Sequence, residues 1–296
     1  MEQERRHGLA EQGPPEPVGL QTRTITVGEK TYWLQTAGEG MPLVLLHGFT
    51  GSSKTWLPFF PALARHFQVV AVDLPGHGQT VAPDDPEGYR MERVCDDLLA
   101  VLDELGIGVF HLLGYSMGGR LALHVALAAP QRVRTLVLES ASPGIADEAE
   151  RAARRRQDEA LAKQLEEKGL AWFVSYWENI PLFASQKRLP ADVRQQIRQQ
   201  RLAQRAQGLA CSLRGMGAGV QQALQDRLPE LGMPVLLLTG QLDDKYHRLA
   251  EWMQTRIPRC CWVSVADAGH AVHIEKPDVF TREVLSFLMN PSFFRA

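Results

Sequence analysis

Short runs of apolar residues recur along the chain and alternate with longer stretches in which apolar and polar residues mix. Most of the later runs are apolar throughout, as expected for strands that are buried on both faces of a parallel sheet. The first two runs are separated by three residues, 28–30, and this spacing predicts a β-hairpin. The predicted strands cover residues 22–27, 31–37, 42–47, 68–73, 109–114, 134–140, 234–240 and 261–266.

Amphipathic stretches with a helical period lie between these strands. A regular alternation of strands and helices is typical of a doubly wound α/β sheet with helices on both faces. We therefore predict an α/β core that is formed by residues 21–143 and 232–296. The predicted helices of this core lie around residues 91–105, 117–129, 245–257 and 277–289.

The segment 144–231 interrupts this alternation because it contains no convincing strand. Residues 147–180 and 190–216 each have the pattern of a helix. A helical insertion between two strands would lie over the carboxyl ends of the sheet, so we predict that residues 144–231 form a lid. Residues 1–20 are polar and contain prolines, and we interpret them as a disordered leader without the apolar core of a secretion signal.

A serine lies between two glycines where a predicted strand turns into a predicted helix. The sequence Gly114-Tyr115-Ser116-Met117-Gly118 fits the G-x-S-x-G pattern of a nucleophile elbow, in which glycines allow a tight turn and the serine hydroxyl is exposed. An ordinary turn with two incidental glycines is the alternative for the pentapeptide alone. The flanking strand and helix favour the elbow, and Ser116 is the candidate nucleophile.

A serine nucleophile needs a general base, and the base needs a carboxylate that orients it. In folds with this elbow, the chain order is serine, acid, histidine. Asp243 follows a predicted strand and His270 follows the next one, so they are the candidate acid and base. Asp244 is interpreted as a solvated loop residue, and His273 lies toward the following helix.

Two backbone amides are candidates for an oxyanion hole. One belongs to Met117, the residue after the serine, and the other belongs to Phe49, in the loop after the strand 42–47. His47 in the same region is interpreted as a packed, hydrogen-bonded loop residue. The glycine-rich loop 73–80 lacks the Lys-Ser/Thr ending of a phosphate-binding loop, so we interpret it as structural.

The formal net charge of −2 gives no support to nucleic-acid binding. Residues 151–214, in contrast, contain ten Arg, three Lys and six Asp or Glu, an excess of seven positive charges. A cationic lid above a serine site favours an anionic substrate, and the planar fork of arginine suits carboxylates. Arg120, one helical turn after Ser116, is interpreted as a substrate-binding residue, with an ion pair to a neighbouring acid as the alternative.

The four cysteines have no zinc-site spacing, and the adjacent Cys260 and Cys261 are expected to point to opposite faces of a strand. Reduced thiols in a cytoplasmic protein are therefore expected. No stretch approaches the ~18 unbroken apolar residues of a membrane-spanning helix, so no membrane contact is expected. The pattern of residues does not indicate the oligomeric state.

Four motifs in order along the chain resemble those of the α/β-hydrolase superfamily: "HGFTGS", "DLPGHG", "GYSMGG" and "DAGH". The resemblance implies a mostly parallel twisted sheet that is flanked by helices, with a helical lid between two strands. Further segments resemble the 2-succinyl-6-hydroxy-2,4-cyclohexadiene-1-carboxylate synthases of menaquinone biosynthesis. They are "GYSMGGR", "LESASPGI", "ERAARRRQDEALA", "WFVSYWENIPLFAS" and "LACSLRGMG".

This narrower resemblance implies a lyase that eliminates pyruvate from 2-succinyl-5-enolpyruvyl-6-hydroxy-3-cyclohexene-1-carboxylate, with no cofactor and no metal. It implies that Ser116, Asp243 and His270 form a triad that abstracts a proton. The substrate-binding residues that it implies are Tyr115, Arg120, Arg154, Trp177 and Arg201.

Two other functions remain open at this stage. A serine hydrolase that acts on esters or carbon–carbon bonds would share the triad, and only the arginines and the lid segments distinguish it. A small-molecule receptor with a hydrolase-like fold is the second alternative, and an intact triad stands against it.

Overall fold

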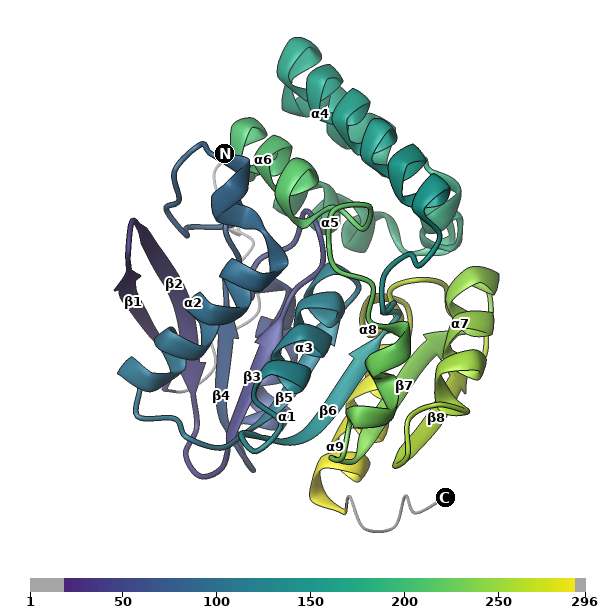
Figure 1. Cartoon of the computed structure of the whole chain (residues 1–296). Coiled ribbons are helices and arrows are strands. Elements are labelled where there is room, and N and C mark those ends of the chain that lie inside the picture. The colour runs from purple at the N-terminus through teal and green to yellow at the C-terminus, as the bar shows by residue number, and fades with distance from the viewer. Residues whose placement is uncertain (1–18, 291–296) are drawn as a thin grey trace, which may run out of the picture.

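One eight-stranded sheet runs through the computed structural model, which describes residues 19–290 (Figure 1). The strand order is β1-β2-β4-β3-β5-β6-β7-β8, and the ladders from β4 to β8 are parallel. The strands are β1 (Gln21–Val27), β2 (Lys30–Ala37), β3 (Pro42–Leu46), β4 (Gln68–Val72), β5 (Phe110–Tyr115), β6 (Val133–Glu139), β7 (Val235–Gly240) and β8 (Cys260–Val265).

The first two strands form the predicted hairpin at one edge of the sheet. β1 and β2 pair antiparallel up to Val27 and Lys30, and β2 in turn pairs antiparallel with β4. Gly28 in the turn adopts a left-handed φ of 57°, which suits a residue without a side chain. All eight predicted strands are confirmed to within one residue at each end.

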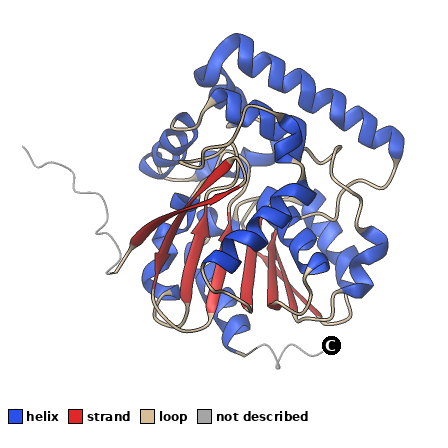
Figure 2. Cartoon of the chain, turned by 60° about the vertical axis from the view of Figure 1, so that its left-hand side comes forward, coloured by secondary structure: helices blue, strands red, loops and turns tan. Residues whose placement is uncertain are grey.

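Helices cover both faces of the sheet, as the alternating pattern predicted (Figure 2). Successive residues of β3 pack into different cores, because Leu43 and Leu45 join one apolar cluster while Val44 joins the other. Helices α2, α3 and α7 contribute to the Val44 side, and α1, α8 and α9 to the opposite side. Their bounds are α1 (Phe60–Leu63), α2 (Met91–Glu104), α3 (Met117–Ala128), α7 (Asp244–Gln254), α8 (Val272–Glu275) and α9 (Pro277–Met289).

The chain between β6 and β7 is helical and lies above one edge of the sheet (Figures 1 and 2). It has a small apolar core of its own, which includes Leu165, Phe173 and Leu209. Its elements are α4 (Glu148–Trp177), the 3-10 helix η3 (Pro181–Arg188), α5 (Ala191–Leu202), α6 (Ala206–Met216) and the 3-10 helix η4 (Gln225–Glu230). Two further 3-10 helices, η1 (Ser53–Phe59) and η2 (Pro86–Tyr89), lie in loops of the core.

The prediction of one helix over residues 190–216 is wrong, because the structure divides this stretch into α5 and α6. At the break, the buried Gln204 side chain donates hydrogen bonds to the carbonyl oxygens of Thr50 and Gly51 and accepts one from the amide of Gly78. These partners lie in loops that follow β3 and β4. The break therefore fastens the lid to the carboxyl ends of the strands.

The long helix α4 also departs from a uniform helix. Gly169 has φ 80° and ψ 171°, so the chain kinks there. None of the helices within residues 19–290 is long and apolar enough to cross a membrane. The predicted leader, residues 1–20, lies outside the described residues except for Gly19 and Leu20.

Candidate active site

Ser116 lies in a strained turn between β5 and α3. Its φ of 50° and ψ of −106° are unusual for a residue with a side chain. The turn brings Gly114 so close to Gly118 that a Cβ on Gly114 would meet the Gly118 carbonyl oxygen at 2.4 Å. A side chain cannot fit at Gly114, and the turn holds the Ser116 hydroxyl at the start of a helix.

The side chains of Ser116, His270 and Asp243 form a continuous chain of hydrogen bonds. Nε2 of His270 lies 2.9 Å from the Ser116 hydroxyl oxygen, and Nδ1 of His270 lies 2.6 Å from Oδ2 of Asp243. His270 and Asp243 are 1% and 7% exposed, so solvent does not compete for these bonds. When Nδ1 donates to the carboxylate, Nε2 is left to accept the serine proton.

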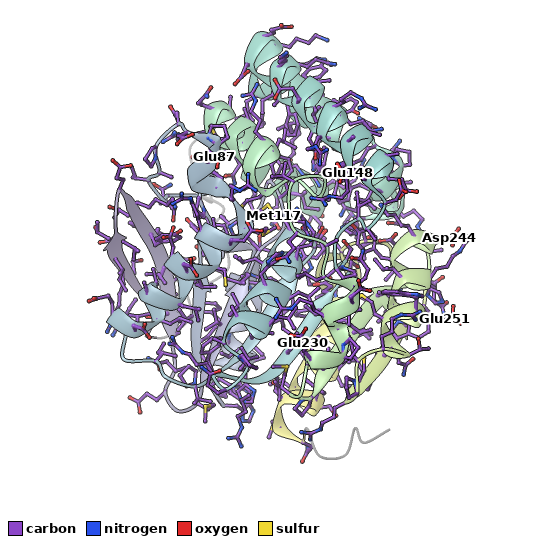
Figure 3. The ribbon with its side chains drawn as sticks, viewed as in Figure 1. Glu87, Met117, Glu148, Glu230, Asp244 and Glu251 are labelled. Carbon is purple, nitrogen blue, oxygen red and sulfur yellow. The ribbon has the colours of Figure 1, made fainter. Side chains whose placement is uncertain are left out.

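Asp243 is held by the start of α7. It is the N-cap of this helix, and its Oδ1 accepts a hydrogen bond of 3.4 Å from the amide of Tyr246. Asp244, the next residue, is exposed and lies on the outer side of α7 (Figure 3). The cap thus directs one carboxylate inward and leaves the other in solvent.

The amides of Phe49 and Met117 are free for an anionic ligand. Met117 is the first residue of α3, and Phe49 lies in the loop after β3. Neither amide donates a hydrogen bond to any of residues 19–290. The loop lies directly against the serine, because a Cβ on Gly48 would be 3.5 Å from the Ser116 Cβ. Figure 3 shows Met117 in the middle of the molecule, below the lid.

His47 and the loop 73–80 support this site without facing it. His47 is fully buried, its Nδ1 bonds the Gly48 carbonyl, and its Nε2 accepts from the amide of Leu74. Burial lowers the His47 pKa, so the ring is neutral. The carboxylate of Asp73 accepts from the amides of Ser53 and Gln79, which fastens the glycine-rich loop. Both features fit the structural interpretation of this region.

Arg120 is held by neutral acceptors. Its Nη1 donates to the Met216 carbonyl at 2.7 Å and to the side-chain oxygen of Gln221. Within residues 19–290, no carboxylate forms an ion pair with it, so the alternative of an ion pair does not apply. Burial lowers the pKa of Arg120 to about 10. The guanidinium is a partly buried positive charge that forms no ion pair within residues 19–290, although the charge of Asp158 acts to raise its pKa.

Arg154 combines a fixed position with free donors. Its Nε lies 2.9 and 3.0 Å from the two oxygens of Asp158, a buried carboxylate one turn along α4. Its other guanidinium nitrogens have no hydrogen bond within the described part of the chain. Burial raises the pKa of Tyr246, and the charges of Arg120 and Arg154 oppose that rise. The positive charges of both arginines therefore act on the phenol.

Tyr246 packs against the imidazole of the triad, and sequence reasoning did not find it. Its ring centroid lies 4.6 Å from that of His270. Its position three residues after Asp243, within reach of the helix cap, was the signal that could have identified it. Burial lowers the pKa of the neighbouring Lys245, and the positive charge of Arg154 lowers it further.

Trp177 packs against Phe49, which belongs to the loop after β3. Its ring stacks on Phe173 at 5.6 Å and meets Phe49 edge-on at 5.3 Å. The indole Nε1 is buried and has no hydrogen-bond partner among residues 19–290. Tyr115 lies on the floor of the site, with its ring 5.4 Å from that of His270.

Arg201 is buried on the lid side of His270. Its guanidinium carbon lies 4.9 Å from the centroid of the Phe183 ring, and that ring lies 6.0 Å from the His270 ring. Burial lowers the pKa of Arg201, while Tyr115 acts in the opposite direction. Phe183 was not identified from the sequence, because an aromatic residue in a helical segment is ordinarily a packing residue.

A second buried acid–imidazole pair lies next to the triad. Glu139 ends β6, and its carboxylate accepts hydrogen bonds from the amide of His273 and from His273 Nδ1, the latter at 2.8 Å. The His273 ring packs edge-on against Tyr115 at 4.6 Å. A carboxylate at the end of an apolar strand was the signal for this pair. Among residues 19–290, no group of three or more His, Cys, Asp or Glu could hold a metal ion.

The chain is similar to known proteins over most of its length. Residues 41–277 match the family model of the alpha/beta hydrolase fold. A protein of Bacillus subtilis (strain 168), provisionally named a 2-succinyl-6-hydroxy-2,4-cyclohexadiene-1-carboxylate synthase, is 43% identical over 83% of this chain and 89% of its own.

Two further similarities agree with that one. The 2-succinyl-6-hydroxy-2,4-cyclohexadiene-1-carboxylate synthase of Serratia proteamaculans (strain 568) is 31% identical over 84% of this chain and 93% of its own. The solved structure of MenH from S. aureus superposes with a TM-score of 0.83 at 38% identity, covering 87% of this chain and 97% of the other.

Proposed function

Since the chain belongs to the α/β-hydrolase family and, within it, to the 2-succinyl-6-hydroxy-2,4-cyclohexadiene-1-carboxylate synthases, we propose that it catalyses the reaction for which these synthases are named. The reaction is a carbon–oxygen lyase step of menaquinone biosynthesis. It eliminates pyruvate from 2-succinyl-5-enolpyruvyl-6-hydroxy-3-cyclohexene-1-carboxylate and leaves the cyclohexadiene.

We further propose that the reaction takes place in the cytoplasm, in keeping with four free cysteines.

The hydrogen-bonded chain from Asp243 through His270 to Ser116 is the observation that carries this proposal. His270 draws the hydroxyl proton toward its Nε2, and the serine oxygen takes a proton from the substrate ring. The buried Asp243 carboxylate stabilises the imidazolium that forms. The two electrons of the broken C–H bond form a new ring double bond, and the electrons of the double bond already in the ring shift to the carbon that bears the enolpyruvyl group. The C–O bond to this group then breaks, and the group leaves with its electron pair and is protonated to pyruvate by the proton that His270 has taken up.

Negative charge develops on the succinyl carbonyl oxygen that is conjugated with the deprotonated carbon. The free amides of Phe49 and Met117 are the donors that would stabilise it. Fixed donors of this kind are effective because they need no reorientation during the reaction, and removing one costs ~3 kcal/mol of barrier. In the elimination they hold an enolate, so no acyl-enzyme is required.

The guanidinium groups near the triad support a polycarboxylate as the substrate. Arg120 and the buried Arg201 form no ion pair with a carboxylate of residues 19–290, and Arg154 keeps donors free. A buried positive charge without a counter-charge is costly, and a substrate carboxylate relieves that cost. Arginine–carboxylate pairs also orient the leaving group relative to Ser116.

An assay of the full-length chain tests this function directly. The preceding pathway enzyme supplies the unstable substrate, and two products are followed together: pyruvate, through a coupled dehydrogenase, and the conjugated diene, through its ultraviolet absorbance. We expect one pyruvate for each diene, at rates proportional to the protein concentration. Diene formation no faster than without the protein would overturn the proposal.

A further inference from the structure

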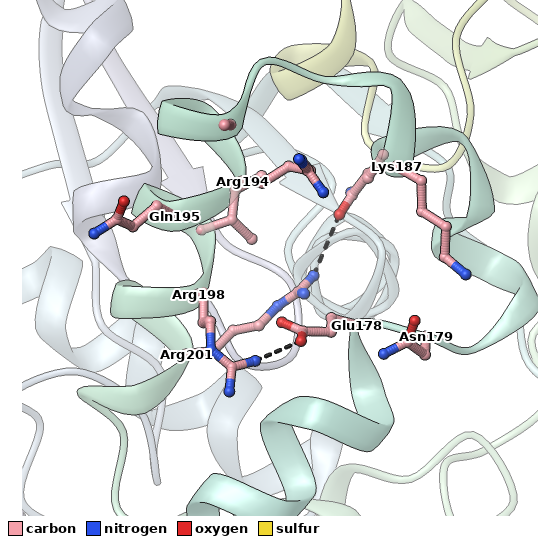
Figure 4. A pocket seen from close by; sticks show the side chains of 10 residues that line it. Glu178, Asn179, Lys187, Arg194, Gln195, Arg198 and Arg201 are labelled. Carbon is pink, nitrogen blue, oxygen red and sulfur yellow. Dashed lines mark hydrogen bonds and ion pairs between the residues drawn. The ribbon is translucent and has the colours of Figure 1, made fainter.

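Several arginines of the lid are neutralised by carboxylates of the lid itself. Arg198 on α5 forms an ion pair with Glu178, as Figure 4 shows. Arg214 on α6 lies between Glu159 and Glu166 of α4, at 2.8 and 2.5 Å. These pairs fasten one lid helix to the next. Because each guanidinium already faces a negative charge, it has little attraction left for an anionic ligand.

Two arginines near the triad meet the side-chain oxygen of a glutamine instead. Nη1 of Arg120 donates to Oε1 of Gln221 and, at 2.7 Å, to the carbonyl oxygen of Met216. Nη2 of Arg201 donates to Oε1 of Gln186 at 3.5 Å. An amide oxygen accepts a hydrogen bond and carries no net charge, so it can fix the direction of a guanidinium without cancelling its charge. Arg120 has two such acceptors, so its orientation is the better determined.

Gln221 is held firmly in the segment between α6 and η4. It is only 1% exposed, and a Cβ on Gly144 would lie 2.9 Å from its Nε2. The residues that follow it are tied to the loop after β6. The amide of Leu224 donates to the Pro143 carbonyl at 2.8 Å, and Nε2 of Gln225 donates to the Gly144 carbonyl at 2.9 Å. The Gln221 side chain therefore has little freedom to turn away from the guanidinium.

The other charges near Arg120 do not neutralise it. Asp158 is the carboxylate that acts on it, but both oxygens of Asp158 accept hydrogen bonds from Nε of Arg154. One carboxylate thus serves two guanidinium groups, and a net positive charge remains. This charge belongs to the helix that begins at the nucleophile, because the Arg120 amide donates to the Ser116 carbonyl at 3.0 Å.

We propose that Gln221 is a positioning residue for the substrate, because it orients the Arg120 guanidinium and, being uncharged, leaves the positive charge available to a substrate carboxylate. A carboxylate in its place would form an ion pair with Arg120, and this internal anion would compete with the substrate. The inference rests on the function proposed above, and it adds a residue that acts through Arg120 rather than through its own contact with substrate.

Gln221→Glu tests this role, because glutamate has nearly the shape of glutamine and adds one negative charge. Pyruvate release by the full-length chain is measured at steady state. We expect KM to rise about tenfold or more and kcat to change by less than about threefold, which is the signature of lost ground-state binding. The Tm should equal or exceed that of wild type, since the new carboxylate pairs with a guanidinium that forms no other ion pair within residues 19–290.

Two variants separate the charge of the side chain from its structural role. Gln222→Glu is the matched control, because it makes the same change at the adjacent, exposed glutamine, and its KM should stay within about twofold of wild type. Gln221→Met removes the acceptor without adding charge. Its Tm should fall, because Arg120 loses a hydrogen bond, while its KM should rise less than that of Gln221→Glu.

The opposite order of Tm and KM distinguishes this role from a packing role, in which loss of stability and loss of activity go together. The inference is overturned if Gln221→Glu has the KM of wild type or a lower Tm, if Gln222→Glu raises KM as much, or if Gln221→Met raises it more. Absence of pyruvate release by wild type would instead refute the proposed function, so the two failures are distinguishable.

Discussion

The indole ring of Trp177 packs edge-on against the phenyl ring of Phe49, with the two ring centroids 5.3 Å apart. Trp177 ends the long lid helix α4, and Phe49 belongs to the loop after β3, which lies against Ser116. The indole Nε1 is buried without an acceptor among residues 19–290. The contact joins the lid to the loop after β3, and it leaves the indole N–H without a partner among these residues.

Trp177→Phe separates these two roles, because it keeps an aromatic ring beside Phe49 and removes the N–H. A hydrogen bond to a charged group contributes ~1.5–3 kcal/mol, so kcat/KM should fall about 10- to 100-fold. The measurement is the initial rate of pyruvate release. Trp172→Phe is the control, since Trp172 stacks on Tyr176 on the same helix. An equal loss in both variants would mean that the N–H has no part in substrate binding.

Arg154→Ala removes the guanidinium that Asp158 holds near Tyr246. We expect kcat/KM to fall about 10- to 100-fold in Arg154→Ala, through loss of a charge-assisted pair with substrate. The kcat/KM of Arg154→Lys should lie between those of Arg154→Ala and wild type, because lysine keeps the charge without the planar fork. Arg156→Ala, an exposed arginine of the same helix, should have wild-type activity. Since Asp158 loses its partner, the Tm of each variant is measured as well. Unchanged kcat/KM in folded Arg154→Ala would remove this residue from the site.

Stability should fall in mild acid. Burial lowers the pKa of His77 to about 3 and that of His111 and His124 to about 4. In the unfolded chain a histidine titrates near ~6.5, so below that pH the unfolded state binds more protons. The contribution of these neutral histidines to the free energy of unfolding is complete above pH ~6.5. It falls as the pH falls toward ~4, by up to ~2 kcal/mol per histidine at pH ~5.

Urea unfolding of wild type and His124→Gln at neutral pH and in mild acid measures this effect. On acidification, the free energy of unfolding of the variant should fall by ~2 kcal/mol less than that of wild type. The reason is that one buried imidazole no longer takes up a proton on unfolding. His66→Gln, an exposed histidine, is the control and should behave as wild type. Identical acid sensitivity in wild type and His124→Gln would refute the assignment of this cost to His124.

Much of this architecture could be predicted from the sequence. Strands such as β3 and β4 are apolar at nearly every position, and only burial on both faces explains that pattern. The order of Ser116, Asp243 and His270 follows from the loops that end β5, β7 and β8. Their contacts at 2.6 and 2.9 Å come from the structure, since these loops are far apart in sequence.

Other features were not accessible because they depend on tertiary partners. The break between α5 and α6 arises from the hydrogen bonds of Gln204 to loops more than a hundred residues away. The pattern of residues 190–216 contains no trace of those partners. Likewise, an arginine-rich lid does not reveal which guanidinium is buried. The structure places Arg201 inward over Phe183, whereas Arg194 and Arg156 are exposed.

Ester hydrolysis distinguishes this lyase from a serine hydrolase with the same triad. Buried guanidinium groups around the site disfavour an uncharged ester, so p-nitrophenyl acetate and butyrate should be turned over at least about 10³-fold more slowly than the native substrate, without a burst of nitrophenol. Stopped-flow absorbance measures both quantities. A stoichiometric burst followed by fast turnover would indicate acyl-enzyme chemistry and favour the hydrolase.

The most direct test of the central claim is pyruvate release by Ser116→Ala under single-turnover conditions, with protein in excess over substrate. The account predicts a rate at least about 10³-fold below that of wild type, while the product still binds, because the arginines that hold its carboxylates are intact. Release of pyruvate by Ser116→Ala at a rate close to that of wild type would contradict the assignment of Ser116 and His270 as the groups that remove the ring proton.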